Sequence, residues 1–226
     1  MQRLTFSNLT FDHLANLVDL QEQEGIHHPW TIVDQINLTE SDRHCLQDIQ
    51  NRIQGEPLHL LNEATLWARA IYPLLVLAEQ DSIRAWGEVP LKAAYAQFEL
   101  EGIVDGLLGK SIGGRIKAPY LVVVETKRGI EAQNPLAQLY GQLLAAAKIN
   151  WQQDHQDPQE MFGCYTIADS WTFVKGLVQA LESDCPRLTV ESSQEYAEKV
   201  DAEIILKLLK AIVLRSCFKP LKRDQV

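Results

Sequence analysis

The chain has 226 residues, of which 21 are Lys or Arg and 30 are Asp or Glu, so its formal net charge is −9. An apolar content of 46% with 23% charged residues is typical of a globular protein and excludes disorder throughout. No segment approaches the roughly 20 consecutive apolar residues that cross a bilayer, and the N-terminus lacks the pattern of a signal peptide. We therefore expect a cytoplasmic protein with no membrane partner.

Charge and motif content narrow the classes of function further. A protein that coats nucleic acid is usually basic, so a nucleic-acid role here must depend on a local patch. The sequence contains no P-loop, dinucleotide-binding or lipase-type motif. The cysteines form no C-x-x-C pair, which argues against a zinc ribbon and a disulfide framework. They are Cys45, Cys164, Cys185 and Cys217.

No repeat or flexible linker divides the chain, so we expect one domain over residues 39–226 with an N-terminal extension, 1–38, packed on it. Thr39 is suited to cap the first clear helix, with Asp42 three residues on, and Gly55 ends it. A second helix begins after Asn62 and carries an apolar stripe to Ala78. Pro73 lies inside this stripe and predicts a kink or a local break.

The middle of the chain changes to strand chemistry. Extended segments are predicted at 82–91, 96–109 and 119–127, and the last, PYLVVVETK, has the continuous apolar run of a strand covered on both faces. Asn134 and Pro135 then open a helix to about 150. A hairpin (162–167 and 171–178), a short strand (187–191) and an amphipathic helix (201–218) follow. The pattern predicts an α/β fold, a mixed central sheet flanked by helices.

Glu125 and Lys127 stand at the end of the strongest predicted strand. Side chains alternate along a strand, so these two share a side, about 6–7 Å apart along the chain. A strand running out into solvent would also carry charges, and Glu-x-Lys alone favours that simpler interpretation.

Asp105 lies near the preceding predicted strand. If the two strands pair as a meander, Asp105 and Glu125 meet at one edge of the sheet. Two carboxylates with open positions suit Mg²⁺, which keeps several of its waters, and a nearby Lys can stabilise charge on a phosphate. Alternatively, Asp105 is a turn residue before Gly106.

Taken in order, these residues resemble the PD-(D/E)XK nuclease superfamily, in particular the N-terminal nuclease domain of type I restriction motor subunits and related DNA-repair nucleases. The resemblance rests on a helical Glu63, the Asp105 segment GIVDGLLG, LVVVETK with Glu125 and Lys127, and the aliphatic-x-Pro-x-Leu stretch around Pro73. It spans about residues 60–150. Val104 stands where the family usually has proline.

The resemblance implies a restriction-endonuclease-like core with an N-terminal helical extension, and it implies roles for single residues. Asp105, Glu125 and Glu63 would hold Mg²⁺ or Mn²⁺, Glu63 through a bound water. Lys127 would orient the attacking water. Gln138 would help to position the lysine or the substrate, although Gln142 shares its helix face and could be the residue that points at the site.

The implied activity is metal-dependent hydrolysis of phosphodiester bonds in nucleic acid, with DNA expected rather than RNA, and a homodimer or a protein partner is left open. The alternative is a catalytically silent nuclease-like fold that binds or assembles in a DNA repair or defence complex, and a third is a small phosphoester hydrolase. Glu99 and Glu101 could replace Glu63 as the extra acid. A basic hairpin between the key strands could touch phosphates or be solvated; it carries Lys110, Arg115 and Lys117.

Overall fold

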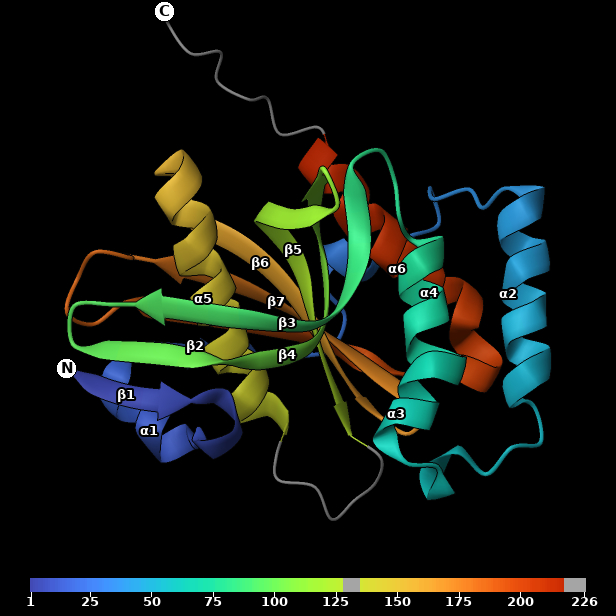
Figure 1. The fold of residues 1–226 in the computed structure, drawn as a ribbon, viewed down its shortest axis with the longest axis horizontal. Coiled ribbons are helices and arrows are strands. Elements are labelled where there is room, and N and C mark those ends of the chain that lie inside the picture. Colours follow the sequence, from blue (N-terminus) through green and yellow to red (C-terminus); the bar gives the residue numbers. More distant parts are fainter. Residues whose placement is uncertain (128–134, 218–226) are drawn as a thin grey trace, which may run out of the picture.

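The computed structural model describes residues 1–127 and 135–217. It has a mixed eight-stranded sheet with helices on both faces (Figure 1), which confirms the predicted fold class. Seven strands follow the order β1-β4-β5-β6-β7-β8-β2, and β3 pairs with β4 beside this path. In chain order the strands are β1 (Gln2–Thr5), β2 (Asp19–Glu22), β3 (Ile83–Ala94), β4 (Phe98–Ile112), β5 (Arg115–Lys127), β6 (Gln159–Ile167), β7 (Ser170–Gln179) and β8 (Arg187–Ala197).

Strands β3, β4 and β5 form the predicted meander. Both neighbours pair with β4 in antiparallel orientation, and the β4–β5 turn falls at Gly113 and Gly114, which both have positive φ. β5 then pairs with β6 in parallel, through the crossover helix α5 (Pro135–Asp154). The predicted cap at Asn134 lies outside the described residues. The meander brings the Asp105 and Glu125 segments side by side, since Gly106 pairs with Val124.

The N-terminal extension does more than cover the core. It holds helix α1 (Phe11–Leu17), but it also supplies β1 and β2, which add parallel edge strands to β4 and β8. Segments of four residues are too short to show a period in sequence, so these two strands were not predicted. Among the described helices, none is both long and apolar enough to cross a membrane.

Helix α2 begins where local chemistry predicts, whereas α6 begins earlier. Helix α2 (Glu40–Ile53) starts with a reciprocal capping box, in which Thr39 accepts from the Asp42 N–H and Asp42 accepts from the Thr39 N–H. Helix α6 (Glu198–Cys217) starts three residues before the predicted position, and its backbone departs from helical angles at Asp201. The predicted last residue, Phe218, lies outside the described residues.

The second predicted helix is divided into three pieces. Asn62 caps α3 (Glu63–Leu66), a π-helical turn (Trp67–Ile71) follows, and α4 (Tyr72–Leu77) contains Pro73. A proline has no N–H to donate and clashes with the preceding turn, so the wider turn before Pro73 accommodates it. The break predicted from Pro73 is therefore confirmed.

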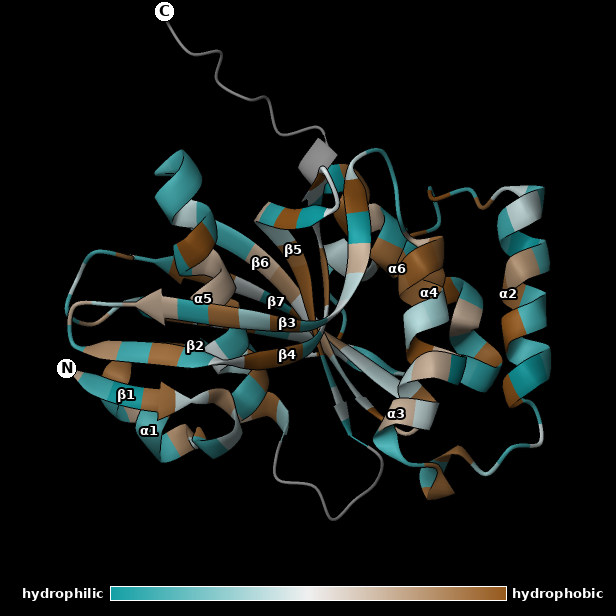
Figure 2. Cartoon of the chain, in the orientation of Figure 1, coloured by the Kyte–Doolittle hydropathy of each residue, from teal (hydrophilic) through white to brown (hydrophobic). Residues whose placement is uncertain are grey.

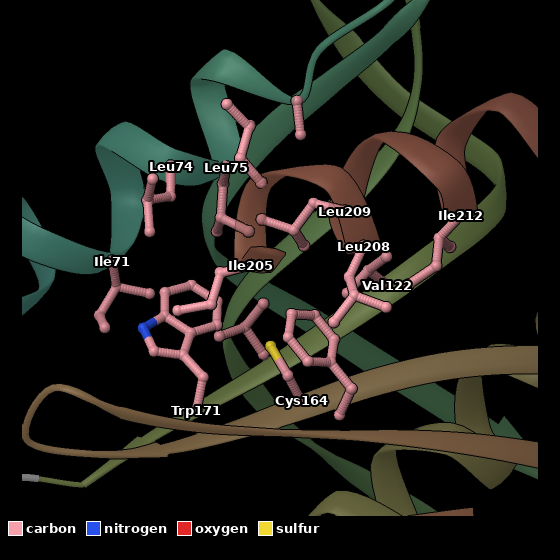
Figure 3. Packing of buried hydrophobic residues seen from close by; sticks show 14 of the residues in the cluster. Ile71, Leu74, Leu75, Val122, Cys164, Trp171, Ile205, Leu208, Leu209 and Ile212 are labelled. Atoms are coloured by element: carbon pink, nitrogen blue, oxygen red, sulfur yellow. The ribbon is translucent and has the colours of Figure 1, made fainter. Parts of the chain in front are cut away.

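Two apolar clusters fill the space between the sheet and its helices. One packs α2, α4 and α6 against one face, with Val122 and Val124 of β5 in it (Figure 3). The other packs α1 and α5 against the opposite face and includes Val123. In Figure 2, brown hydrophobic segments lie on β5 and on parts of β4, and also on helix α4. Because neighbours in β5 alternate between the clusters, Glu125 lies on the face covered by α5.

Candidate active site

The C-terminal end of β5 and the middle of β4 bring two carboxylates together. Asp105 is half-buried, and its Oδ2 accepts a hydrogen bond of 2.6 Å from the backbone N–H of Thr126. Glu125 is completely buried. The antiparallel register that pairs Gly106 with Val124 places Asp105 beside Glu125. The predicted meeting of these two residues is therefore confirmed, although it falls on the central strands β4 and β5 and not at an edge of the sheet.

Each oxygen of Glu125 contacts a different polar group. Lys127 Nζ lies 2.5 Å from Oε1, so Glu125 and Lys127 occupy the same side of β5 as alternation predicts. Gln142 Nε2 donates to Oε2 at 2.6 Å, across the gap between β5 and α5. The Lys127 side chain is 19% exposed while that of Glu125 is fully buried. The carboxylate thus holds the lysine amine at the border between the core and solvent.

Helix α5 carries both glutamines considered in the sequence. Gln142 is fully buried and contacts Glu125, whereas Gln138, one turn earlier, is half-buried. In the described part of the chain no hydrogen bond joins Gln138 to Asp105, Glu125 or Lys127. The sequence left the choice between the two open, because residues four apart share one helix face. The contact belongs to Gln142.

Glu63 reaches the same region from the helical side. It is the first residue of α3 and is exposed. Its charge contributes to a raised pKa both for Asp105 and for Lys127, which places it within electrostatic range of the two. In Figure 1, α3 lies close to the lower end of β5.

The indole of Trp67 packs on Gly106, the residue that follows Asp105 in β4. Trp67 begins the π-helical turn and packs so closely on Gly106 that a Cβ there would lie 2.1 Å from Trp67 Cη2. A Cβ on Gly87 of β3 would also touch Trp67, at 3.6 Å from its Nε1. Two glycines on neighbouring strands thus let the ring approach the sheet. Trp67 was not singled out from the sequence, although two isolated glycines within strand patterns signal such a close approach.

The two carboxylates favour their neutral forms more than isolated acids do. Burial raises the pKa of Glu125 to about 7, with a further contribution from the Asp105 charge, against the opposing effect of Lys127. Burial also raises the pKa of Asp105, and the Thr126 hydrogen bond only partly offsets it. Burial is the largest single influence on Lys127 and disfavours its charged form, but the hydrogen bond to Glu125 and the negative charges of Glu125, Asp105 and Glu63 together outweigh it, so the lysine pKa is raised. The centre therefore contains too much negative charge for the single ammonium.

This donor set fits a hard divalent cation. Within residues 1–127 and 135–217 no three His, Cys, Asp or Glu side chains are grouped closely enough to hold a metal ion by themselves. Mg²⁺ needs only one or two carboxylates, because it retains several waters. Asp105 and Glu125 provide that pair. Burial is the main cause of the raised pKa of Glu125, and a cation would offset the repulsion from Asp105 that adds to it. The site geometry is thus compatible with Mg²⁺ or Mn²⁺.

Two other groups considered from the sequence lie elsewhere. Glu99 and Glu101 both bind Lys92 on β3, at 2.9 and 3.0 Å, so neither is free to replace Glu63. The basic β4–β5 hairpin turns at the start of β5, whereas Glu125 and Lys127 lie at the end of that strand. Of the two interpretations of this hairpin, the structure favours the solvated tip over contact with phosphates at the site, because the 13 residues of β5 separate its turn from Glu125 and Lys127.

Comparison of the sequence with protein-family models and with curated proteins found no match.

Proposed function

We propose that the protein is a metal-dependent nuclease that hydrolyses phosphodiester bonds in DNA. The observation that carries the proposal is the Asp105, Glu125 and Lys127 arrangement, in which adjacent strands present two carboxylates and Glu125 holds the lysine amine at 2.5 Å. The order of helical Glu, Asp and Glu-x-Lys, which resembles the PD-(D/E)XK superfamily, supports the same activity.

Some residues of the site would bind the metal ion, and others hold these ligands in position. Asp105 and Glu125 would hold Mg²⁺ or Mn²⁺, and Glu63 would bind one of its waters from α3. When bound, the ion would supply Lewis-acid stabilisation of the phosphate and a more acidic water. Thr126 fixes Asp105 through its N–H, and Gln142 fixes Glu125 through its amide. These hydrogen bonds hold the two carboxylates in place before substrate arrives.

In hydrolysis, Lys127 could act either as a base or as a hydrogen-bond donor, and its charge state decides which. Its raised pKa keeps the amine protonated at neutral pH, because the hydrogen bond to Glu125 and the surrounding carboxylate charges together overcome the effect of burial. A protonated amine is a donor and not a base. Lys127 therefore orients the attacking water or stabilises charge on the phosphate, and it does not remove the proton from the water.

The proposal is tested with purified protein, Mn²⁺ or Mg²⁺, and linear, circular, single-stranded and branched DNA. Asp105→Asn is the informative variant, because the side-chain oxygen can still accept from Thr126 while the charge is lost. We expect metal-dependent cleavage by the parent protein and its loss, by at least about a hundredfold, in Asp105→Asn and in Lys127→Ala. Lys117→Ala, at the far end of β5, is the matched control and should cleave normally.

Thermal melting of every variant accompanies the assay, because removing Lys127 leaves a buried carboxylate without its cation. Cleavage that survives in a folded Asp105→Asn, Lys127→Ala double variant would refute the proposal. A parent protein that binds Mn²⁺ but cleaves none of the substrates, with or without added DNA-repair or defence proteins, would favour the catalytically silent binding module.

A further inference from the structure

Strand β3 has an interruption directly opposite the candidate site. The pairs Gly87↔Gly106 and Val89↔Val104 lie on either side of it in one continuous register, and the residues between them, Glu88 and Asp105, are not paired. Glu88 therefore lies opposite Asp105 across the two strands. It is exposed, so burial of apolar surface does not account for its position.

The backbone of Glu88 is in a conformation that a glutamate rarely adopts. Its φ is +51°, in the left-handed region where a Cβ crowds the following carbonyl. Glycine tolerates this region without strain, and asparagine and aspartate visit it more often than other residues. A glycine is present next to this position, at Gly87, but the residue with positive φ is Glu88.

The strand register brings the charge of Glu88 close to the site. Residues opposite one another on neighbouring antiparallel strands are near neighbours, and two like charges in such a pair are unfavourable. In the part of the chain that the structure describes, Lys127 is the single cation acting on Asp105 and Glu125, and the other charged groups that act on them are carboxylates. Such an excess is unfavourable unless a cation balances it.

A buried acceptor at the same place points to a ligand independently. The amide of Gln142 is fully buried, and while its Nε2 donates to Glu125, its Oε1 has no hydrogen-bond partner among the described residues. A buried polar atom without a partner is costly, which in native structures calls for a bound water or ion. The atom without a partner is a carbonyl oxygen, which can accept a hydrogen bond from a water in the shell of a cation or contact the cation itself.

We propose that Glu88 is an additional carboxylate of this centre, which strengthens the binding of a divalent cation at Asp105 and is kept in a strained backbone for that purpose. The inference rests on the proposed function, because it adds the negative charge of Glu88 to the metal centre proposed there. Glu88 acts as a positioning residue through the cation and is assigned no contact with the substrate.

Three substitutions separate the charge of Glu88 from its backbone strain. Glu88→Gln removes the charge and keeps the Cβ, whereas Glu88→Gly removes both. Asp81→Gly is the matched control, because Asp81 is exposed, has a φ of +52° and precedes β3. The readouts are the Kd for Mn²⁺, from the electron paramagnetic resonance signal of the free ion, and the melting temperature without metal.

We expect Glu88→Gln and Glu88→Gly to weaken Mn²⁺ binding roughly three- to tenfold. This is the change in affinity that the loss of one unit charge produces when it acts on a divalent ion over about 7 Å in water. Glu88→Gly and Asp81→Gly should each raise the melting temperature, by about 2 °C, because the left-handed strain is relieved. Glu88→Gln should give a smaller rise, from the loss of charge repulsion alone, and Asp81→Gly should bind Mn²⁺ like the parent.

Unchanged Mn²⁺ affinity in Glu88→Gln, or a parent protein that binds no Mn²⁺, overturns the inference. The nuclease proposal fails separately. A protein that cleaves DNA through Lys127 but binds Mn²⁺ equally well with Glu88→Gln keeps the activity and loses the role of Glu88. A protein that cleaves nothing but loses Mn²⁺ affinity in Glu88→Gln keeps this cation site and loses the nuclease.

Discussion

Glu198 makes the stability of the protein depend on pH in a predictable direction. It is the first residue of α6, is fully buried, and its Oε2 accepts a hydrogen bond of 2.8 Å from Trp171 Nε1. Its other oxygen, Oε1, has no hydrogen-bond partner among the described residues. Burial raises its pKa to about 7, the Trp171 hydrogen bond opposes this, and the charge of Asp169 adds to it. We therefore expect a neutral carboxylic acid in the folded protein below that pH.

The sign follows from proton binding in the two states. Between pH 4.5, the ordinary pKa of a glutamate, and about pH 7, the folded protein holds this proton and the unfolded chain releases it. Stability therefore falls as the pH rises through this window and levels off above it. A difference of about 2.5 pH units, at about 1.4 kcal/mol each, gives a loss of about 3 kcal/mol. That is a sizeable part of a typical free energy of unfolding of about 5–15 kcal/mol.

Glu198→Gln is the perturbation that isolates this effect, because an amide has the shape of the protonated acid and its oxygen can still accept from Trp171. We expect the variant to be more stable than the parent by about 3 kcal/mol at pH 8 and to differ little near pH 5. Urea unfolding followed by tryptophan fluorescence from pH 5 to 8.5 measures the difference. Glu203→Gln, on the same helix but exposed and paired with Lys207, is the control and should show no such pH dependence. A constant difference between Glu198→Gln and the parent across this range would refute the argument.

Two further substitutions test packing and charge around the central strands. Gly106→Ala places a Cβ 2.1 Å from Trp67 Cη2, so we expect the free energy of unfolding, measured by heat or urea, to fall by about 1–3 kcal/mol. Adding Trp67→Phe to this variant should recover most of the lost stability. If it recovers none, the indole is not the obstacle. Lys110 and Lys117 are directly opposite in the β4–β5 pairing, so Lys117→Glu should stabilise the protein by about 0.2–1 kcal/mol at low salt and less at high salt. A loss of stability at low salt would contradict this, and DNA cleavage should stay unchanged because the hairpin lies at the far end of β5.

The elements that could be predicted from sequence are those with strong local signals. The apolar run of β5 predicted a strand covered on both faces, and Val122 and Val123 do pack into different clusters. Thr39 with Asp42 predicted the start of α2, and Pro73 predicted the break before α4. Each of these signals lies within one segment, so no knowledge of distant contacts was needed.

The parts that escaped prediction depend on long-range contacts. β1 and β2 are four residues long and are strands only because β4 and β8 offer free edges. At the candidate site, alternation predicted that Glu125 and Lys127 share a side, but the contact of Gln142 with Glu125 depends on how α5 lies across β5. Glu88 could not be found either, since a glutamate with positive φ has no sequence signature.

Three irregular or unfavourable features of this fold lie around one point. The β3–β4 ladder is interrupted at Asp105, a π-helical turn begins at Trp67 beside it, and a buried carboxylate lies on the next strand at Glu125. Local rules of structure are broken at places where function requires it, and elsewhere in this protein helices and strands mostly obey them. A net charge of −9 also opposes contact with a phosphate backbone. On the proposed function, a bound divalent cation therefore serves twice: it balances the acidic centre, and it supplies the positive charge that a DNA phosphate needs at that point.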